Sequence, residues 1–340
     1  MNKVSVVILN YNGIKYLRQF LPSVIANSQD EGVEIVVADN SSTDSSIQFM
    51  KESYPDIRLI EFDTNSGYAG GYNAALEQVN SEYYILLNSD VEVPENWIKP
   101  VLEFLDNNRD VAAAMPKIKS YTKKSHFEYA GAAGGFIDKY GYPFCRGRVL
   151  SFVEEDNNQY NDIADIFWAS GACLFVRAEL FHKAGGFDTD FFAHMEEIDL
   201  CWRLWHMGHR IVIVPDSEVF HVGGGTLPIN TPFKMYLNYR NNLFLLQKNL
   251  PSEKLFPVLL SRLILDGASA MVYLLKLSFG FFGAVFRAHM HFYKNLRKTH
   301  KKRKQIQKFC SQKNISTIYN HSMVFNFIIR KRRVFKEYKF

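Results

Sequence analysis

Hydrophobic and polar positions in the first 90 residues follow two alternating periods. Short, nearly continuous apolar runs, typical of buried strands, are separated by stretches in which apolar residues recur every three or four positions, as in amphipathic helices. The pattern predicts strands at Val4–Leu9, Glu34–Ala38, Arg58–Phe62 and Tyr83–Leu87, and helices at Ile14–Ala26, Ser45–Ser53 and Ala69–Val79. This alternation favours an α/β fold with a Rossmann-like, mostly parallel central sheet and helices on both faces.

The pattern changes twice further along the chain. From about residue 95 to 230 it predicts short strands and glycine-rich turns, and beyond Thr231 it predicts long helices. Residues 1–230 are therefore expected to form the main domain, 231–310 a helical region and 311–340 a basic tail.

The helical region has an unusually wide apolar surface. Within residues 255–286, the polar residues Arg262, Asp266, Ser269 and Lys276 fall on one narrow stripe. No uninterrupted apolar run there reaches the ~18–20 residues that span a bilayer. We expect C-terminal amphipathic helices that lie at a membrane interface; the alternative is an ordinary core helix packed on the main domain.

Composition narrows the class of protein. With 47% hydrophobic and 15% aromatic residues, the 340-residue chain is not a disordered one. Its four cysteines have neither metal-ligand spacing nor the density of a disulfide scaffold, which favours reduced thiols and a cytoplasmic location. The apolar run at the N-terminus is too short for a secretion signal.

The net charge of +5 conceals two regions of opposite sign. Residues 287–340 carry 16 Lys and Arg and one acidic residue, which leaves 24 basic and 34 acidic residues in the rest of the chain. A basic segment suits nucleic acid or an anionic membrane, and the apolar surface beside it favours the membrane. We expect a peripheral protein on the inner face of the cell membrane, with no nucleic acid partner.

Polar residues gather where the predicted strands end, which is where parallel sheets bind ligands. The candidates for ligand binding are Asn10, Asn12, Asp39, Asn40, Asn65, Gly67, Asn73 and Asn88. Asp39 could accept a hydrogen bond from the N3–H of uracil or thymine, and the glycines of segment 65–73 would let a ligand approach a helix N-terminus, which is a natural anion site.

Two carboxylates follow the strand that ends near residue 87. Because side chains alternate along a strand, Asp90 and Glu92 are expected to point the same way and to offer oxygen ligands to Mg²⁺ or Mn²⁺. His221 could be a third metal ligand, a phosphate contact or a structural residue. Ordinary turn chemistry would also explain the two acids.

A third group of acids suggests a general base. If a helix opens at Glu196, then Glu196, Asp199 and Arg203 share one face and Glu197 is turned away. A carboxylate at a helix N-terminus in a pocket can act as a general base, and the alternative is a solvated, salt-bridged first turn.

Taken in order, these segments resemble the family 2 glycosyltransferases of the GT-A fold, in particular the rhamnosyltransferase-like branch that builds bacterial surface polysaccharides. The resemblance covers roughly residues 3–245. It rests on the motifs at residues 4–13, 36–44, 65–73, 87–92, 171–177, 185–188 and 196–203.

The resemblance implies an inverting glycosyltransferase that takes its sugar from a UDP- or dTDP-linked donor. Asp39 would read the base, Asn10 and Asn12 would line the nucleotide pocket, and Asp90 would hold a divalent metal (Mg²⁺ or Mn²⁺) on the diphosphate. Glu196-Glu197 resembles the family's Glu-Asp pair, whose second member deprotonates the acceptor. Here that member is Glu197, so the base stays open between Glu197 and Glu196.

The acceptor implied is a glycan or a lipid-linked glycan. A non-catalytic sugar-nucleotide-binding protein that serves as an assembly partner at the membrane is the alternative, since Glu replaces the usual Asp. The sequence identifies neither the sugar nor the oligomeric state.

Overall fold

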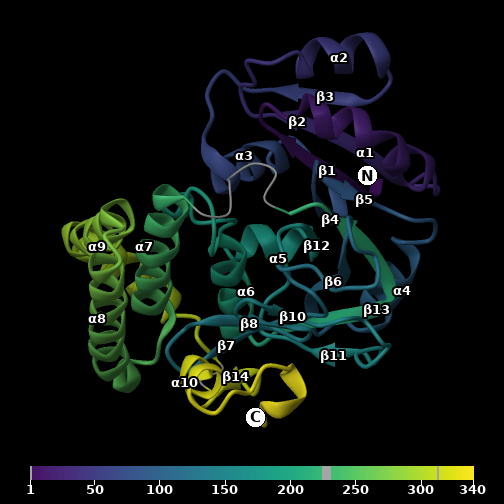
Figure 1. Ribbon diagram of the computed structural model, residues 1–340. Coiled ribbons are helices and arrows are strands. Elements are labelled where there is room, and N and C mark those ends of the chain that lie inside the picture. The colour runs from purple at the N-terminus through teal and green to yellow at the C-terminus, as the bar shows by residue number, and fades with distance from the viewer. Residues whose placement is uncertain (1, 224–230, 312–313) are drawn as a thin grey trace.

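The strands and helices predicted for the first 88 residues are all present in the computed structural model, which describes residues 2–223, 231–311 and 314–340 (Figure 1). Their ends differ from the predicted ends by at most three residues. These elements are β1 (Asn2–Asn10), α1 (Ile14–Ala26), β2 (Val33–Asp39), α2 (Ser46–Ser53), β3 (Arg58–Glu61), α3 (Gly67–Leu76) and β4 (Ser81–Asn88).

The central sheet has nine strands, of which β3, β2, β1 and β4 are adjacent and parallel. Val6 and Val7 of β1 point to opposite faces and both are completely buried, so both faces of the sheet are covered. Beyond β4 the sheet is mixed: β12 (Cys173–Arg177) is antiparallel to β4 and to β6 (Val111–Ser120), and β13 (Arg210–His221) is parallel to β6. The predicted α/β class is confirmed, and the predicted parallel pairing holds for the first four strands.

A second sheet of five strands packs beside the first, in the order β10, β9, β8, β7 and β14. The remaining elements up to residue 206 are β5 (Val91–Glu92), α4 (Lys99–Asn107), β7 (Gly135–Asp138), β8 (Pro143–Cys145), β9 (Arg148–Val149), β10 (Phe152–Val153), β11 (Ala164–Asp165), α5 (Ala178–Lys183), η1 (Thr189–Phe191) and α6 (Glu196–His206).

The last 27 residues, expected only as a basic tail, pack against this second sheet at the end of the molecule opposite α2 (Figure 1). They contain β14 (Ile318–Tyr319), α10 (Met323–Ile328) and η2 (Phe335–Glu337). β14 pairs with β7, and the Met323 amide donates to the buried Asp138 carboxylate over 2.8 Å. Burial raises the pKa of Asp138 to about 6, although backbone N–H groups act against this. The segment is therefore fixed by backbone pairing and a buried hydrogen bond.

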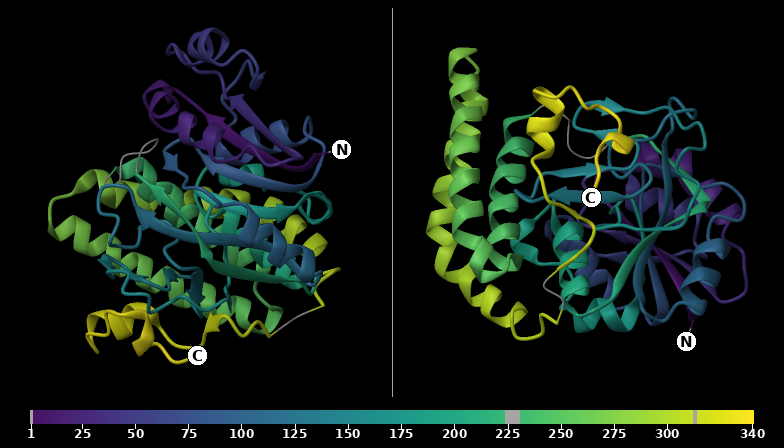
Figure 2. Two further views of the ribbon diagram at one scale, coloured as in Figure 1. Left: turned by 90° about the vertical axis from the view of Figure 1, so that its right-hand side faces the viewer. Right: turned by 90° about the horizontal axis from the view of Figure 1, so that it is seen from below.

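Three long helices, α7 (Pro232–Asn249), α8 (Ser252–Leu275) and α9 (Phe279–Ile306), lie side by side along one flank of the molecule, with α8 outermost (Figures 1 and 2). The charged residues in the middle of α8 face inward: Arg262 and Asp266 are buried and 3.1 Å apart. By length and composition α8 could cross a membrane, although this pair interrupts its apolar sequence.

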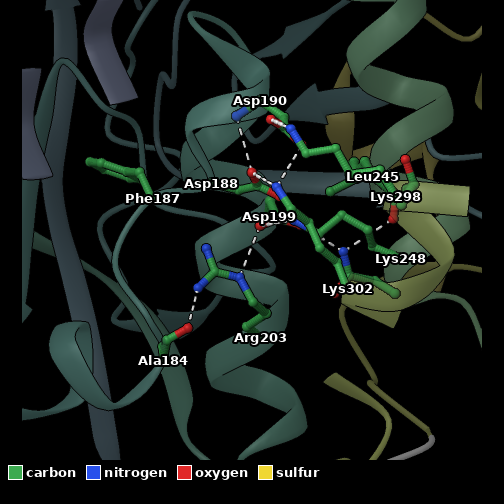
Figure 3. Close-up of polar contacts among 12 residues, drawn as sticks. Ala184, Phe187, Asp188, Asp190, Asp199, Arg203, Leu245, Lys248, Lys298 and Lys302 are labelled. Carbon is green, nitrogen blue, oxygen red and sulfur yellow. Dashed lines mark hydrogen bonds and ion pairs between the residues drawn. The ribbon is translucent and has the colours of Figure 1, made fainter. Parts of the chain in front are cut away.

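A buried charge network joins these helices to the rest of the chain (Figure 3). Lys248 of α7 contacts Asp188 over 2.5 Å and Asp199 of α6 over 2.9 Å. Lys302 of α9 contacts the same Asp188 and also Asp190, the latter over 2.6 Å. Burial alone would raise the pKa of Asp188, but the two lysines hold it well below its usual range. The helical region is thus attached by ion pairs to the segment that precedes α6.

Candidate active site

The carboxyl ends of β1, β2 and β4 meet at one edge of the central sheet. Asn10 lies opposite Asp39, and Leu9 lies opposite Asn88, which is partly buried. The Asn10 amide donates to Asp39 Oδ2 over 2.8 Å, and the Ser42 backbone N–H donates to Asp39 Oδ1 over 2.7 Å. The strand ends therefore converge as predicted, and Asp39 is held in a fixed orientation.

Other predicted ligand-binding residues form hydrogen bonds between the loops around this edge. Asn12 Oδ1 accepts from the backbone N–H of Thr43 over 2.7 Å. The Asn40 amide donates to the Asn65 side chain and to the Gly67 carbonyl, each over 3.0 Å. These contacts hold the three loops in one arrangement, which is the rigidity that a binding site for a small ligand requires.

The start of α3 contacts the segment before α6. Gly67 has a φ of +75°, and a Cβ there would lie 2.6 Å from Phe192, so only glycine fits. Asn73, further along α3, donates to the Phe187 carbonyl over 2.8 Å and accepts from the Phe187 N–H over 2.9 Å. Asn73 thus attaches α3 to a neighbouring loop, and both ends of its amide are engaged in that structural contact.

Asp90 and His221 come together beside this edge. His221 Nε2 lies 3.1 Å from Asp90 Oδ1, and His221 Nδ1 lies 3.2 Å from Glu128 Oε2. All three side chains are buried. Burial lowers the pKa of His221, but the two carboxylates outweigh it and raise the pKa to about 10. Sequence reasoning missed Glu128, because it stands alone between Phe127 and Tyr129 without a motif.

The structure does not bring Glu92 to this pair. Glu92 forms an ion pair with Lys124, and its strand partner on β13 is Phe220, whereas His221 pairs with Val91. Adjacent residues of a strand point to opposite faces, so Glu92 and His221 lie on opposite sides of β13. The expectation that Asp90 and Glu92 point the same way fails because Asp90 lies in the turn before β5, where side chains no longer alternate.

The predicted helix start at Glu196 is confirmed, and a strained turn leads into it. Phe192, His194 and Met195 have φ values of 65°, 70° and 75°, a left-handed region that residues with a Cβ rarely adopt. The Phe192 carbonyl accepts from the Tyr68 N–H of α3 over 2.8 Å. The turn therefore fixes the first residues of α6 against the start of α3.

Burial controls the ionisation of the two candidate bases. It raises the pKa of Glu197 to about 7, although backbone N–H groups at the start of α6 act against it. Burial, together with the charge of Glu197, raises the pKa of Glu196 well above its usual range. Glu196 is buried and Glu197 is partly exposed. Burial therefore favours the protonated form of both carboxyl groups, and more strongly that of Glu196.

Glu128 and Glu197 both influence the ionisation of one buried thiol. Burial is the largest cause of the raised pKa of Cys145 on β8, and the charges of Glu128 and Glu197 both add to it. Glu128 in turn contacts His221 and, through it, Asp90. Glu128, which orients His221, and Glu197 of α6 thus both act on the same buried thiol.

The Asp90–His221 pair fits a divalent metal. A carboxylate oxygen and an imidazole nitrogen face each other, and both would be ligands of Mn²⁺ once the metal displaced the proton that the raised pKa keeps on His221. Glu128, on the other ring nitrogen, occupies the place of the outer carboxylate that commonly orients a metal-bound histidine. Among residues 2–223, 231–311 and 314–340, no three or more His, Cys, Asp or Glu side chains are placed so that they could hold one metal ion together. Further ligands would have to come from a bound diphosphate, as is usual for such ions.

Comparison with known proteins identifies the family. The sequence model described as glycosyl transferase family 2 matches residues 5–184, more than half of the chain. The chain belongs to glycosyl transferase family 2. The matched residues contain the strand-end loops, Asp90 and Glu128, whereas α6 with its carboxylates begins 12 residues after the match ends.

Two curated relatives agree with the branch that the motifs indicated. The N-acetylglucosaminyl-diphospho-decaprenol L-rhamnosyltransferase of Mycobacterium tuberculosis is 28% identical over 231 residues, which cover 64% of this chain and 75% of the relative. The rhamnosyltransferase WbbL of Escherichia coli is 22% identical over 227 residues, which cover 64% and 83%.

Solved structures confirm the GT-A fold. S. aureus TarS 1-349 in complex with UDP-GlcNAc superposes with a TM-score of 0.56 at 16% identity, and the match covers 89% of this chain and 92% of that one. GalNAc-T7 with UDP, GalNAc and Mn²⁺ gives a TM-score of 0.59 at 18% identity over 75% of this chain, which spans about half (49%) of the GalNAc-T7 chain.

Proposed function

We propose that this family 2 member is an inverting glycosyltransferase that moves a sugar from a UDP- or dTDP-linked donor to a glycan or lipid-linked glycan in cell-surface polysaccharide synthesis. The observations that carry this proposal are the Asp90–His221 pair beside the strand ends and, at the start of α6, a carboxyl group, Glu197, whose pKa is raised to about 7. The Asp90–His221 pair suits a diphosphate leaving group, and Glu197 suits deprotonation of a hydroxyl.

The donor site is proposed at the ends of β1 and β2. Asp39 is buried, yet each of its carboxylate oxygens keeps a lone pair beyond the hydrogen bonds from Asn10 and Ser42. One of them would accept the N3–H that uracil and thymine share. Asp90 and His221 would hold Mg²⁺ or Mn²⁺ on the diphosphate, and a metal there would neutralise charge on the departing nucleotide.

Glu197 is proposed as the base. It is partly exposed and its pKa is raised to about 7, whereas Glu196 is buried and its pKa is raised well above its usual range. As the acceptor oxygen forms a bond to the anomeric carbon, Glu197 takes its proton, and the bond from that carbon to the diphosphate oxygen breaks. Displacement from the face opposite the leaving group inverts the anomeric centre. A protonated Glu196 lowers the repulsion that would otherwise oppose ionisation of Glu197.

A lipid-linked acceptor is supported by the outer face of α8. Phe256, Ile264 and Leu275 recur along this face and are 74%, 65% and 76% exposed, while the charged residues Arg262 and Asp266 are buried. A soluble helix has the reverse arrangement. The basic residues exposed on the same helical hairpin are Lys254, Lys276, Arg287, Lys294, Arg297, Lys298, Lys301 and Lys304.

We therefore assign this face to an anionic membrane surface. A peripheral position on the inner face of the cell membrane suits an enzyme with a cytoplasmic donor and a lipid-linked acceptor. The relative from Mycobacterium tuberculosis, whose name specifies a diphospho-decaprenol acceptor, agrees with this class of substrate. The helix lies on the membrane rather than across it, because the Arg262–Asp266 pair attaches it to the rest of the protein.

Turnover of the two glutamine variants tests the assignment of the base. General-base catalysis typically supplies ~10²–10⁴-fold, so Glu197→Gln should lower kcat by about that factor in release of nucleoside diphosphate from a donor sugar. Glu196→Gln, which mimics the protonated form, should retain most of the activity. If Glu196→Gln is inactive and Glu197→Gln is active, the assignment is reversed; if both retain full kcat, neither residue is the base.

A further inference from the structure

The strained turn before α6 has its carbonyl groups fixed by one side chain of α7. The Asn241 side-chain nitrogen lies within hydrogen-bonding distance of three carbonyl oxygens, those of Phe191 (3.0 Å), Ala193 (2.9 Å) and His194 (2.7 Å). Asn241 is completely buried. Its two N–H groups thus face the part of the backbone that turns left-handed and delivers Glu196 and Glu197.

Arg240 supports the same contact. Its Nη2 donates to the carbonyls of Asp190 (3.0 Å) and Phe191 (2.9 Å), and its Nε donates to Asn241 Oδ1 over 2.8 Å. This last bond fixes which way the Asn241 amide points, so its nitrogen faces the turn. Two adjacent residues of α7 therefore bind the turn from residue 190 to residue 194.

We infer that Asn241, oriented by Arg240, is a positioning residue that holds the turn in the conformation that places Glu197 for proton transfer. This inference rests on the proposed role of Glu197 as the base. A left-handed backbone at Phe192, His194 and Met195 persists only where the surroundings fix it. The hydrogen bonds from Asn241 and Arg240 act directly on the carbonyl groups of this turn.

The same contact links the base to the C-terminal helices. Arg240 Nη1 donates to the Tyr236 hydroxyl over 3.3 Å, and that hydroxyl contacts His291 of α9. Lys302 of α9 contacts Asp188 and Asp190 at the start of the turn (Figure 3). The helical region thus contributes to the active site, although none of its described residues is proposed to touch the reacting atoms.

Asn242 is a matched control on the same helix. It is the same residue type and is equally buried, but its amide donates to the Gly141 carbonyl over 2.6 Å, in the turn between β7 and β8. Asn241→Ala and Asn242→Ala therefore remove comparable buried amides with different targets. Asn241→Asp keeps the size and the bond from Arg240 but replaces the N–H donors by oxygen, and it serves if the alanine variant does not fold.

The experiment combines steady-state kinetics with hydrogen exchange of the peptides that cover residues 188–199, in the full-length chain. For Asn241→Ala or Asn241→Asp we expect kcat to fall at least tenfold, donor KM to change less than threefold, and exchange of this segment to accelerate. Asn242→Ala should leave kcat within threefold and the exchange of this segment unchanged.

Equal loss of kcat in the Asn241 and Asn242 variants, or unchanged exchange and kcat in the Asn241 variants, would overturn the inference. A wild-type chain that turns over no UDP- or dTDP-sugar would instead refute the proposed function. In that case the exchange measurement would still show whether Asn241 fixes the turn, and unchanged exchange would refute the positioning role separately.

Discussion

Glu197 owes its proposed role to its surroundings at the level of single side chains. A glutamate in water ionises near pH 4, where it is too weak a base to take a proton from a hydroxyl group efficiently at neutral pH. Burial raises its pKa to about 7, and its buried Oε2 has no hydrogen-bond partner among the described residues. Burial, together with the charge of Glu197, raises the pKa of the neighbouring Glu196 well above its usual range.

The rate should therefore depend on pH through Glu197. Because the base must be ionised, kcat is expected to rise about tenfold per pH unit below pH 7 and to level off above it. The group has a higher pKa in the folded than in the unfolded chain, so the stability it contributes is present below about pH 4.5 and is lost as pH rises through about 7.

Glu197→Gln removes this titration, so at pH 8 the variant should melt at a higher temperature than the wild type, with a difference that shrinks toward pH 5. Paired kinetic and thermal scans of both proteins would check this. A wild-type kcat that is flat from pH 6 to 8, or a melting difference independent of pH, would contradict the environment assigned to Glu197.

The sequence predicted some site residues better than others, for a local reason. Asp39 and Asn10 end regular strands, so their meeting follows from strand register alone. Glu92 was placed by extending the alternation through a turn, where it does not hold. Glu128 contacts His221 across 93 residues of chain, a contact that no local pattern records.

Among the helices and strands, α8 shows that one pattern of polar and apolar residues is compatible with either a covered or an exposed apolar face. Its narrow polar stripe and wide apolar face were predicted from sequence, but the stripe alone could not tell whether the apolar face is covered. The structure buries Arg262 and Asp266 of this stripe, partly buries Ser269, and leaves Lys276 and the apolar face exposed. Likewise, the helices and strands of the first 88 residues followed from periodicity, whereas the antiparallel pairing of β12 is set by contacts distant in sequence.

Vesicle binding should depend on the outer face of α8. Burying one large apolar side chain contributes ~1.5–3 kcal/mol, so Phe256→Glu combined with Ile264→Glu should weaken cosedimentation with phosphatidylglycerol-containing vesicles by more than tenfold. Ile163→Glu, a change at an exposed isoleucine outside the helical hairpin, is the control and should have no effect. Raised salt should weaken wild-type binding, because the basic residues act through screened charge.

Unchanged vesicle binding by the α8 variant would refute the membrane assignment. A lipid-free wild type that is dimeric, together with a monomeric α8 variant, would show that a second copy of the chain covers this face instead.

For the whole molecule, the helical region and the main domain form one connected structure. A buried ion pair from Lys248 and partly buried ion pairs from Lys302 reach the segment before α6, and the last 27 residues complete the second sheet. Composition predicted the opposite charges of the two regions but not their attachment, because ion pairs such as Lys302–Asp188 join residues 114 positions apart. The helical hairpin is therefore attached directly to the segment that precedes the proposed base.

The most direct test of the proposed donor site is calorimetric titration of UDP and dTDP into the purified protein, with and without Mn²⁺, for the wild type, Asp90→Asn and Glu92→Gln. We predict binding of at least one nucleotide that requires the metal, is weakened at least about tenfold by Asp90→Asn and is retained by Glu92→Gln. Absence of binding with both nucleotides, or metal-independent binding that Asp90→Asn leaves unchanged, would contradict a nucleoside-diphosphate site at Asp90 and His221.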